Sequence, residues 1–372
     1  MTGSPIDVAI NLLWCRPGKV GGSEDYLVRQ LLGLAEIESV IVPTLYVLPG
    51  FAAAHPDLAG VFRLVEAPIS GRNRLRRIRT EQRWLARQTK ASKLVHHGGG
   101  TLPTRGGRPT VLTIHDLQYL RYPQYFGRFK RSYLRRVMPR SARSADIIAV
   151  PSHFVRESVM DAFGIDAERI VVVPHGLEPT MGAAATDESS LREQYQLGAG
   201  PVVVLPAMTH PHKGHVFLLR VLAEHWTDPD LRLVLIGGQG AAEDTVQRAI
   251  AELGVADRVV RAGRVTQADR DGLLRMATAM VFPSEYEGFG APIIEAMALG
   301  APVICSDRTS LPEVAGDAAI IRPLETGEWA DALDQAIARR DVLVRAGRAR
   351  AGQYTAVRSA EAVLEAYGLA LS

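Results

Sequence analysis

Residues 7–34 read DVAINLLWCRPGKVGGSEDYLVRQLLGL, and this stretch sets the pattern for the whole chain. Its apolar beginning, residues 7–14, predicts a buried strand, and the segment after the two adjacent glycines has the spacing of an amphipathic helix. A strand, a glycine-containing loop and a helix in this order form a βα unit. Such units assemble into a parallel sheet with helices on both faces, so we expect an α/β protein.

The same alternation continues through both halves of the chain. In the first half, further apolar runs predict strands at residues 40–48, 111–114, 147–150 and 170–173. Residues 177–200 are rich in Ala, Thr, Ser, Gly and acidic residues, and a linker is expected where they begin. A second series of strands is predicted at residues 202–205, 231–236, 258–261, 279–282, 303–305 and 319–321, followed by a helical tail at 331–372.

The length of 372 residues exceeds what one hydrophobic core usually serves. We predict two Rossmann-like, doubly wound parallel-sheet domains at residues 1–176 and 177–355, and a C-terminal helix at 356–372 that packs back on the first domain. Open α/β sheets bind ligands outside the carboxyl ends of their strands. Two such edges facing each other would form a ligand cleft.

The composition is that of an ordinary globular protein, with 47% hydrophobic and 22% charged residues. The two cysteines, Cys15 and Cys305, lie far apart in apolar runs, which argues against a disulfide framework. The N-terminus lacks the basic start and cleavage site of a signal peptide, and no apolar run has the length of a membrane span. These features predict a cytoplasmic protein.

Charge is distributed unevenly, because residues 1–176 carry a net charge of +11 and residues 177–372 a net charge of −8. Within the basic half, residues 70–93 hold nine basic residues and one acidic residue, and residues 121–143 hold eight basic residues, none acidic, and several aromatic rings. Such surfaces bind anionic lipid headgroups, which predicts docking on the inner membrane leaflet. The alternative is a solvated basic face. Nucleic acid is not expected, because no nucleic-acid-binding motif is present.

Residues 283–307 read PSEYEGFGAPIIEAMALGAPVICSD and carry the most specific chemical signal in the chain. Glu287 and Glu295 lie on either side of a Gly-Phe-Gly turn that opens a helix, so both carboxylates can face one ligand. Gly288 and Gly290 let the backbone approach a phosphate or sugar closely, and the helix N-terminus adds partial positive charge. Taken singly, Glu287 could cap the helix and Glu295 could be a solvated helix residue.

This segment resembles the paired-glutamate signature of the family 4 retaining glycosyltransferases, which have the two-domain GT-B fold. The resemblance implies that Glu287 binds hydroxyls of the transferred sugar and that Glu295 binds the ribose of a nucleotide-sugar donor. It also places Gly288 at the donor, with the backbone amides of Phe289 and Gly290 on the sugar or the diphosphate. A carboxylate suits these partners because it accepts hydrogen bonds from adjacent hydroxyls.

Residues 205–219, LPAMTHPHKGHVFLL, contain a second matching element. Lys213 follows a predicted strand and resembles the diphosphate-binding lysine of the family, which stabilises charge on the leaving group; alone, it could be a surface lysine. Many family members have an arginine where this chain has Met208, so His210, His212 or a basic group of the first domain would have to substitute. These histidines and His215 match no standard metal-site spacing, and we expect no metal.

Three further segments match the family in order along the chain. Gly21-Gly22 corresponds to the glycine-rich loop near the donor phosphates, although it lacks the three-glycine dinucleotide fingerprint. His115, followed by Asp116, resembles the active-site histidine that faces the sugar, whereas His175 is interpreted as structural. Val265 corresponds to the segment that lines the nucleobase pocket. Residues 237–240, GGQG, are interpreted as an ordinary turn.

These matches predict a retaining hexosyltransferase that acts by front-side displacement, with His115, Lys213 and Glu287 as catalytic residues and without cofactor or metal. The segments PHKGH and EGFGAPIIEAM look closest to mannosyltransferase-like members, so GDP-mannose is the preferred donor and a glycan or lipid-linked molecule the acceptor. UDP-glucose and dTDP-rhamnose are alternative donors. A sugar-nucleotide 2-epimerase and a non-catalytic nucleotide-sugar-binding protein are the alternative functions.

Overall fold

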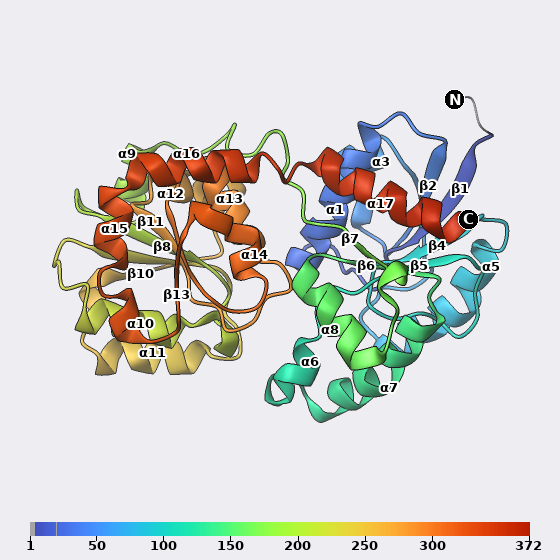
Figure 1. Ribbon diagram of the computed structural model, residues 1–372, viewed down its shortest axis with the longest axis horizontal. Coiled ribbons are helices and arrows are strands. Elements are labelled where there is room, and N and C mark those ends of the chain that lie inside the picture. The colour runs from blue at the N-terminus through green and yellow to red at the C-terminus, as the bar shows by residue number, and fades with distance from the viewer. Residues whose placement is uncertain (1–3, 20) are drawn as a thin grey trace. The chain divides into compact units, whose positions relative to one another are not determined.

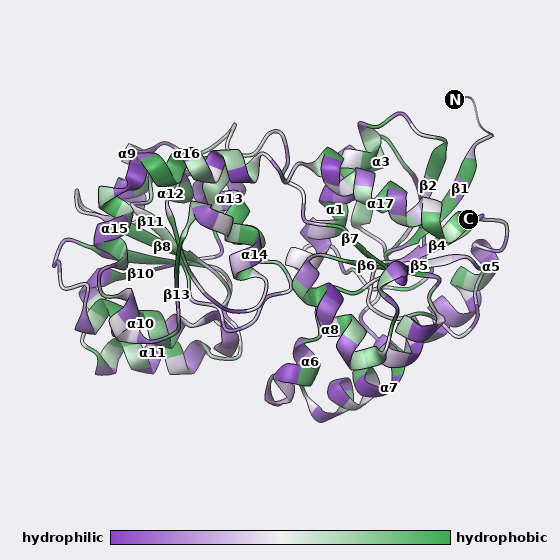
Figure 2. Cartoon of the chain, viewed as in Figure 1, coloured by the Kyte–Doolittle hydropathy of each residue, from purple (hydrophilic) through white to green (hydrophobic). Residues whose placement is uncertain are grey.

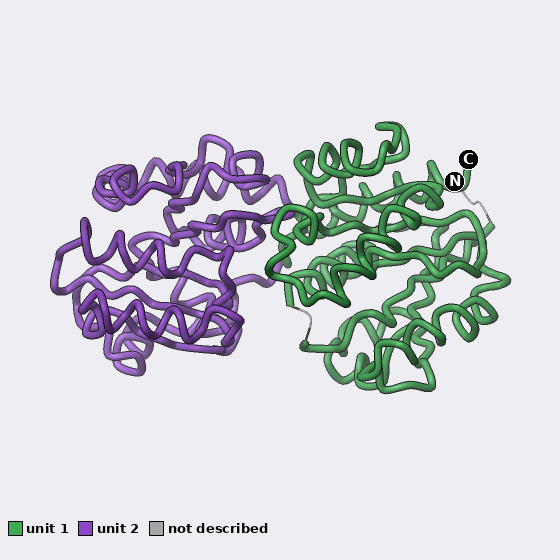
Figure 3. The backbone as a smooth tube through the Cα atoms, turned by 90° about the horizontal axis from the view of Figure 1, so that it is seen from below, with its two compact units in different colours: residues 1–178, 355–372 green, residues 179–354 purple. Residues whose placement is uncertain are grey.

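The computed structural model describes residues 4–19 and 21–372. The chain forms two compact units, of which the first comprises residues 1–178 and 355–372 and the second residues 179–354 (Figure 3). Each unit is built on one parallel sheet with helices packed against it (Figure 1). The predicted fold class of two Rossmann-like α/β domains is therefore confirmed.

The first unit contains a seven-stranded sheet of order β3-β2-β1-β4-β5-β6-β7. Its strands are β1 (Ile6–Asn11), β2 (Ile41–Val47), β3 (Arg63–Glu66), β4 (Leu94–His97), β5 (Thr110–Thr113), β6 (Ile147–Val150) and β7 (Ile170–Val172). The order reverses between β1 and β4, which is where doubly wound sheets open a crevice at their carboxyl edge. Two strands have no counterpart among the predicted runs: β3 is a partly exposed edge strand, and β4 ends in two histidines.

Helices and connecting turns cover this sheet. They are α1 (Gly22–Ala35), α2 (Phe51–Ala54), α3 (Pro56–Ala59), α4 (Arg74–Thr80), η1 (Glu81–Leu85), α5 (Ala86–Gln88), α6 (Gln118–Arg121), η2 (Pro123–Tyr125), α7 (Arg128–Ser144), α8 (His153–Phe163), η3 (Ala167–Arg169) and α17 (Ala356–Leu371). Helix α8 shows how local sequence sets these bounds. The Ser152 side chain accepts a hydrogen bond from the Val155 amide at its start, and Gly164 ends it in the left-handed conformation.

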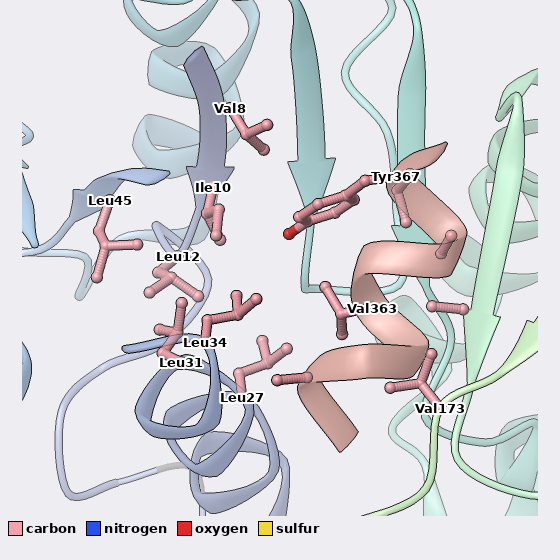
Figure 4. Packing of buried hydrophobic residues seen from close by; sticks show 14 of the residues in the cluster. Val8, Ile10, Leu12, Leu27, Leu31, Leu34, Leu45, Val173, Val363 and Tyr367 are labelled. Atoms are coloured by element: carbon pink, nitrogen blue, oxygen red, sulfur yellow. The ribbon is translucent and has the colours of Figure 1, made fainter. Parts of the chain in front are cut away.

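The last helix of the chain, α17, belongs to the first unit. Val363 and Tyr367 pack in one core cluster with Val8 and Ile10 of β1 (Figure 4). The Tyr367 hydroxyl also lies 2.8 Å from Nδ1 of the buried His96. Where α17 meets α1, a Cβ on Gly33 would lie only 2.0 Å from the Ala356 carbonyl oxygen, so this contact requires glycine.

The second unit contains a six-stranded sheet of order β10-β9-β8-β11-β12-β13. Its elements are β8 (Val202–Pro206), β9 (Arg232–Ile236), β10 (Val259–Gly263), β11 (Ala279–Phe282), β12 (Val303–Ser306), β13 (Ile320–Arg322), α9 (Glu188–Gln194), η4 (Pro211–Lys213), α10 (His215–Glu224), α11 (Glu243–Glu252), η5 (Ala256–Arg258), α12 (Gln267–Met276), α13 (Ala291–Leu299), α14 (Leu311–Ala315), η6 (Gly316–Ala318), η7 (Thr326–Trp329), α15 (Ala332–Ala338) and α16 (Arg340–Ala351). All six predicted strands are present. The order reverses between β8 and β11.

Hydrophobic residues concentrate in the strands and on the inward faces of the helices of each unit (Figure 2). Both cysteines are buried and form no disulfide. Within residues 4–19 and 21–372, none of the helices combines the length and the apolar character that crossing a membrane requires. Because the buried core is mostly apolar, the polar side chains buried at the carboxyl edges of the sheets are candidates for function.

Candidate functional site

The carboxyl edge of the second sheet brings two sequence motifs together. The loop after β8 carries Lys213, the loop after β11 carries Glu287, and β8 and β11 are neighbours at the reversal of strand order. Ligands of doubly wound sheets bind at this point. The two side chains form an ion pair with a distance of 2.5 Å between Lys213 Nζ and Glu287 Oε1.

This ion pair is largely shielded from solvent, since the Lys213 side chain is 19% exposed and the Glu287 side chain 13%. Lys213 Nζ also lies 5.4 Å from the centroid of the Phe282 ring. A shielded pair of opposite charges at a ligand-binding edge is able to separate, with the cation turning to an anionic group and the carboxylate to hydroxyl donors.

Backbone contacts fix the two loops against each other. Gly214 has a φ of 71°, and a Cβ there would lie 2.1 Å from the Pro283 carbonyl oxygen, so only glycine fits. The Glu285 amide donates to the His212 carbonyl oxygen at 2.8 Å. The position of Lys213 relative to Glu287 is therefore set by main-chain geometry.

A third loop, between β12 and α14, holds the Gly-Phe-Gly turn in place. The Glu287 amide donates to Thr309 Oγ1 at 3.0 Å, and the Ser310 hydroxyl lies 3.0 Å from the carbonyl oxygens of both Glu287 and Phe289. Thr309 has a φ of 55°, which is unfavourable for a β-branched residue. Such strain at a site fits a positioning role, and the sequence analysis missed both hydroxyl residues.

Helix α13 begins immediately after this turn. Gly290 precedes it with a φ of 93°, and Glu295 lies further along the helix with only 7% of its surface exposed. Arg270 of α12 places Nη1 3.8 Å from Glu295 Oε2 and also hydrogen-bonds Asp271. Glu295 is thus a buried carboxylate with a cationic neighbour rather than a solvated helix residue.

A pocket of about 690 Å³ lies at the ends of β9 and β10. Gly237, Gly238 and Gln239 line it together with Gly263 and Arg264. Val265, half-buried, is the next residue along the chain. The glycine run does more than turn the chain, because the Gly237 amide donates to the Gly263 carbonyl oxygen at 2.7 Å and so joins the two loops of the pocket.

Three histidines surround Lys213. The rings of His210 and His212 stack with their centroids 5.8 Å apart. Burial lowers the pKa of His212 to about 3 and that of His215 to about 4, and it also lowers the pKa of His210. They are therefore neutral at pH 7 and supply no positive charge in place of the arginine that Met208 replaces. Among the residues that the structure describes, His, Cys, Asp and Glu form no metal-binding group of three or more.

In the first unit, the glycine loop after β1 is tied back to α1. The buried Glu24 accepts hydrogen bonds from the Gly18 amide at 2.9 and 3.0 Å and lies 2.9 Å from His55 Nε2. Gly21 has a φ of 78°, and, apart from its chain neighbours, no atom of the described residues lies within 4 Å of a Cβ built on it or on Gly22. This leaves open space next to the loop, in which Val20 lies outside the described residues. Glu24 was not singled out in the sequence.

His115 follows β5 at the carboxyl edge of the first sheet. Its Nε2 lies 2.9 Å from the Gly98 carbonyl oxygen, which only accepts, so Nε2 carries the proton and Nδ1 is an acceptor in the neutral ring. Burial lowers the pKa of His115, and the hydrogen bond to Gly98 opposes this shift in part. The His115 ring lies 5.6 Å from that of Trp14 and 5.4 Å from that of Tyr26, whose ring also contacts His175.

Comparison with known families accounts for both units. Residues 20–180 match the family described as Glycosyltransferase Family 4, and residues 187–355 match Glycosyl transferases group 1. The chain belongs to the family 4 glycosyltransferases. The family resemblance inferred from the two glutamates is thus confirmed.

The chain is similar to two curated mannosyltransferases. It is 32% identical over 244 residues to O-antigen chain mannosyltransferase B of Escherichia coli, with 64% of this chain and 63% of that protein covered. It is also 32% identical over 196 residues to a GDP-mannose-dependent alpha-(1-6)-phosphatidylinositol monomannoside mannosyltransferase of Mycolicibacterium smegmatis, with 50% of each covered. The chain thus spans between half and two thirds of the length of these relatives.

Solved structures confirm the GT-B fold of the chain. Anabaena Alr3699/HepE, solved in complex with UDP and glucose, has a TM-score of 0.76 at 18% identity and covers 98% of this chain and 99% of its own. WaaG, a glycosyltransferase involved in lipopolysaccharide biosynthesis, has a TM-score of 0.72 at 16% identity over 96% of this chain and 99% of its own.

Proposed function

We propose that this protein transfers mannose from GDP-mannose to a glycan or lipid-linked acceptor, with retention of anomeric configuration and without a metal ion. The observation that carries the proposal is the Lys213–Glu287 ion pair at the reversal of strand order. The mannosyltransferase relatives support mannose as the sugar. Neither a 2-epimerase nor a non-catalytic binding protein is favoured by these relatives.

The ion pair suggests how the protein binds the donor. The donor diphosphate attracts Lys213 and frees Glu287 to accept hydrogen bonds from sugar hydroxyls. The amides at the start of α13, after Gly290, add partial positive charge near the same phosphates. Glu295 would bind the ribose, and the pocket beside Val265 would hold the base.

The chemical step is a front-side displacement. The acceptor hydroxyl oxygen bonds to the anomeric carbon while the bond from that carbon to the diphosphate oxygen breaks. The hydroxyl proton passes to the departing diphosphate, whose charge Lys213 and the α13 N-terminus stabilise. His115, neutral and with Nδ1 as an acceptor, would orient a hydroxyl of a bound sugar.

Thermal shift measurements with four nucleotides test the donor base. At one hundred times its dissociation constant, a ligand adds about 2.7 kcal/mol to the free energy of unfolding. For a domain the size of the second unit, this corresponds to a rise in Tm of roughly 5–10 °C. We expect GDP to give this shift and UDP, dTDP and ADP to give clearly smaller ones. A larger shift with UDP would indicate UDP-glucose, and not GDP-mannose, as the donor. Transfer assays in EDTA test whether the reaction needs a metal ion, and NMR of the product anomer tests retention of configuration.

We also propose that the first unit docks on anionic membranes through α4 and α7. Arg74 lies 4.4 Å above the Tyr133 ring and so joins the two helices. Their surface exposes apolar side chains among many arginines: Phe129 is 95% exposed and Leu75 is 74% exposed. Apolar side chains that insert beside basic residues are typical of interfacial helices.

Vesicle flotation tests this docking. The protein should float with vesicles containing phosphatidylglycerol and not with pure phosphatidylcholine. The L75S/F129S double variant should lower recovery by roughly tenfold or more, because burying each apolar side chain contributes roughly 1.5–3 kcal/mol. The matched control is V61S, since Val61 is also exposed, at 59%, but lies outside both helices. Equal recovery from both vesicle types would contradict the proposal and favour a solvated basic face.

A further inference from the structure

A second pocket, of about 430 Å³, lies within the first unit and is not used by the donor scheme above. Part of its lining is formed by Asn11 at the end of β1, by Trp14 after β1 and by Gly99 after β4, where the strand order of this sheet reverses. The remaining walls come from the loop after β3, from α4 and η1, and from α7. The pocket therefore occupies the ligand-binding edge of the first sheet.

Its lining carries an excess of positive charge. Five cationic side chains line the pocket, and they come from four separate segments: Arg16, Arg72, Arg74, Arg77 and Lys130. Glu81 is the only acidic residue in the lining. Glu81 Oε1 lies 4.0 Å from Arg77 Nε, and burial raises the pKa of Glu81 to about 7, so this carboxyl neutralises the cations poorly. Arg74 and Arg77 are half-buried, whereas the other three cations are exposed. Like charges gathered around one pocket repel each other, and a bound anion would offset this repulsion.

Two hydrogen-bond donors of residues that line the pocket also favour a bound anion. Trp14 Nε1 and Arg77 Nε are buried and have no hydrogen-bond acceptor within the described residues. Both groups can only donate. Arg77 is held in place by a bond from Nη1 to the Trp14 carbonyl oxygen at 3.3 Å, and its Nε has only the ion-pair contact with Glu81 at 4.0 Å, which is too long for a hydrogen bond. Buried donors without acceptors are uncommon in folded proteins, and an anionic ligand would supply the acceptors that these two lack.

We propose that this pocket binds a phosphoryl group of the acceptor. The inference rests on the proposed function, because it assigns the pocket to the substrate that receives the sugar. Planar guanidinium groups match phosphate oxygens in pairs, and several arginines together favour a dianion over a neutral glycan. The Trp14 ring lies 5.6 Å from that of His115, so the phosphoryl group would be held next to the sugar-facing histidine. The phosphate can belong to a lipid-linked glycan or to a soluble sugar phosphate.

Isothermal titration calorimetry in the presence of saturating GDP tests this pocket, because GDP occupies the donor site. The probes are mannose 6-phosphate, geranyl diphosphate and the uncharged methyl mannoside. We expect both phosphorylated probes to bind, with affinity falling as salt is added, and methyl mannoside not to bind. Tighter binding of geranyl diphosphate would assign the phosphate to a lipid, and tighter binding of mannose 6-phosphate to a soluble acceptor.

The R74Q/K130Q variant should weaken phosphoryl binding at least tenfold. Its matched control is R76Q/R136Q, which removes two exposed arginines from the same helices that do not line the pocket. Absence of binding by either phosphorylated probe, or an equal loss in the control variant, would overturn the proposal. So would a loss of GDP affinity in R74Q/K130Q, because the pocket would then serve the donor. If the probes bind but no nucleotide raises the Tm, the proposed function fails while this pocket stands.

Discussion

We expect the Glu287→Ala variant to transfer sugar about a thousandfold more slowly than the wild-type protein, with kcat and kcat/KM falling together. Removing one preorganised polar group that acts on the transition state costs roughly 10²–10³ in rate. The Glu287 carboxylate would both hold the sugar hydroxyls and stabilise positive charge on the sugar ring, which places the effect at the upper end. An equal fall in both constants would mean that the contacts of Glu287 with the sugar gain their strength as charge develops in the transition state.

Glu285→Ala is the matched control for this prediction. Glu285 lies two residues earlier in the same loop, is half-buried, and has a carboxyl pKa raised by burial. Its variant should keep most of the wild-type rate, because its carboxylate is not part of the ion pair with Lys213. A comparable loss in both variants would show that the loop, and not the Glu287 carboxylate, is what activity requires.

The fold could be predicted because its strands are dictated by local composition. Buried parallel strands such as β8 and β11 are short runs of apolar residues, and their pattern is visible without any tertiary information. The strands that were missed lack this signal. Strand β3 is RLVE at an exposed edge, and β4 is LVHH, whose His96 becomes buried only because Thr113 and Tyr367 supply hydrogen-bond partners.

In the candidate site of the second unit, the sequence identified the glycines and the charged residues but not the hydroxyl residues that position them. Lys213 and Glu287 follow strands that were visible in the sequence, so their approach could be anticipated from strand order. Thr309 and Ser310 could not, because their importance depends on a loop of a third strand meeting the Gly-Phe-Gly turn. The alternative that Glu295 is solvated is wrong, because the helix that carries it lies in an apolar environment. Helix α13 is apolar on most of its surface, and six of its nine residues, Glu295 among them, are buried.

The basic character of the first half was evident from composition, but its chemical meaning was not. Residues 70–93 and 121–143 look alike as charge runs, and either could be a solvated face. In the folded unit, Arg74 and Arg77 of α4 and Lys130 of α7 line one pocket, whereas Arg76 and Arg136 of the same helices do not. A count of charges cannot separate these two groups. The folded unit separates them, because only the first group lines the pocket.

Replacing Lys213 should reduce activity and stability together. We expect the K213M variant to lower kcat by roughly two to three orders of magnitude, because the charge on the leaving diphosphate loses its fixed cation. The same change leaves the Glu287 carboxylate, which is 13% exposed, without its partner at 2.5 Å. Removing one member of a buried ion pair costs 3–5 kcal/mol, and residual exposure places this loss at about 3 kcal/mol. Steady-state kinetics and urea denaturation measure the two effects.

The K213M/E287Q double variant separates these effects. Stability requires only that neither charge is left without its partner, whereas the proposed catalysis requires both charged side chains. Removing both charges leaves no unpaired ion, so the free energy of unfolding should return to within about 1 kcal/mol of wild type. Under the proposed function both groups act on the donor, so the double variant should remain as inactive as the worse single variant. Recovered stability with lost activity would mean that the ion pair exists for the donor and not for the fold. If activity returned with stability, Lys213 and Glu287 would be structural partners only, and the donor would have to bind elsewhere.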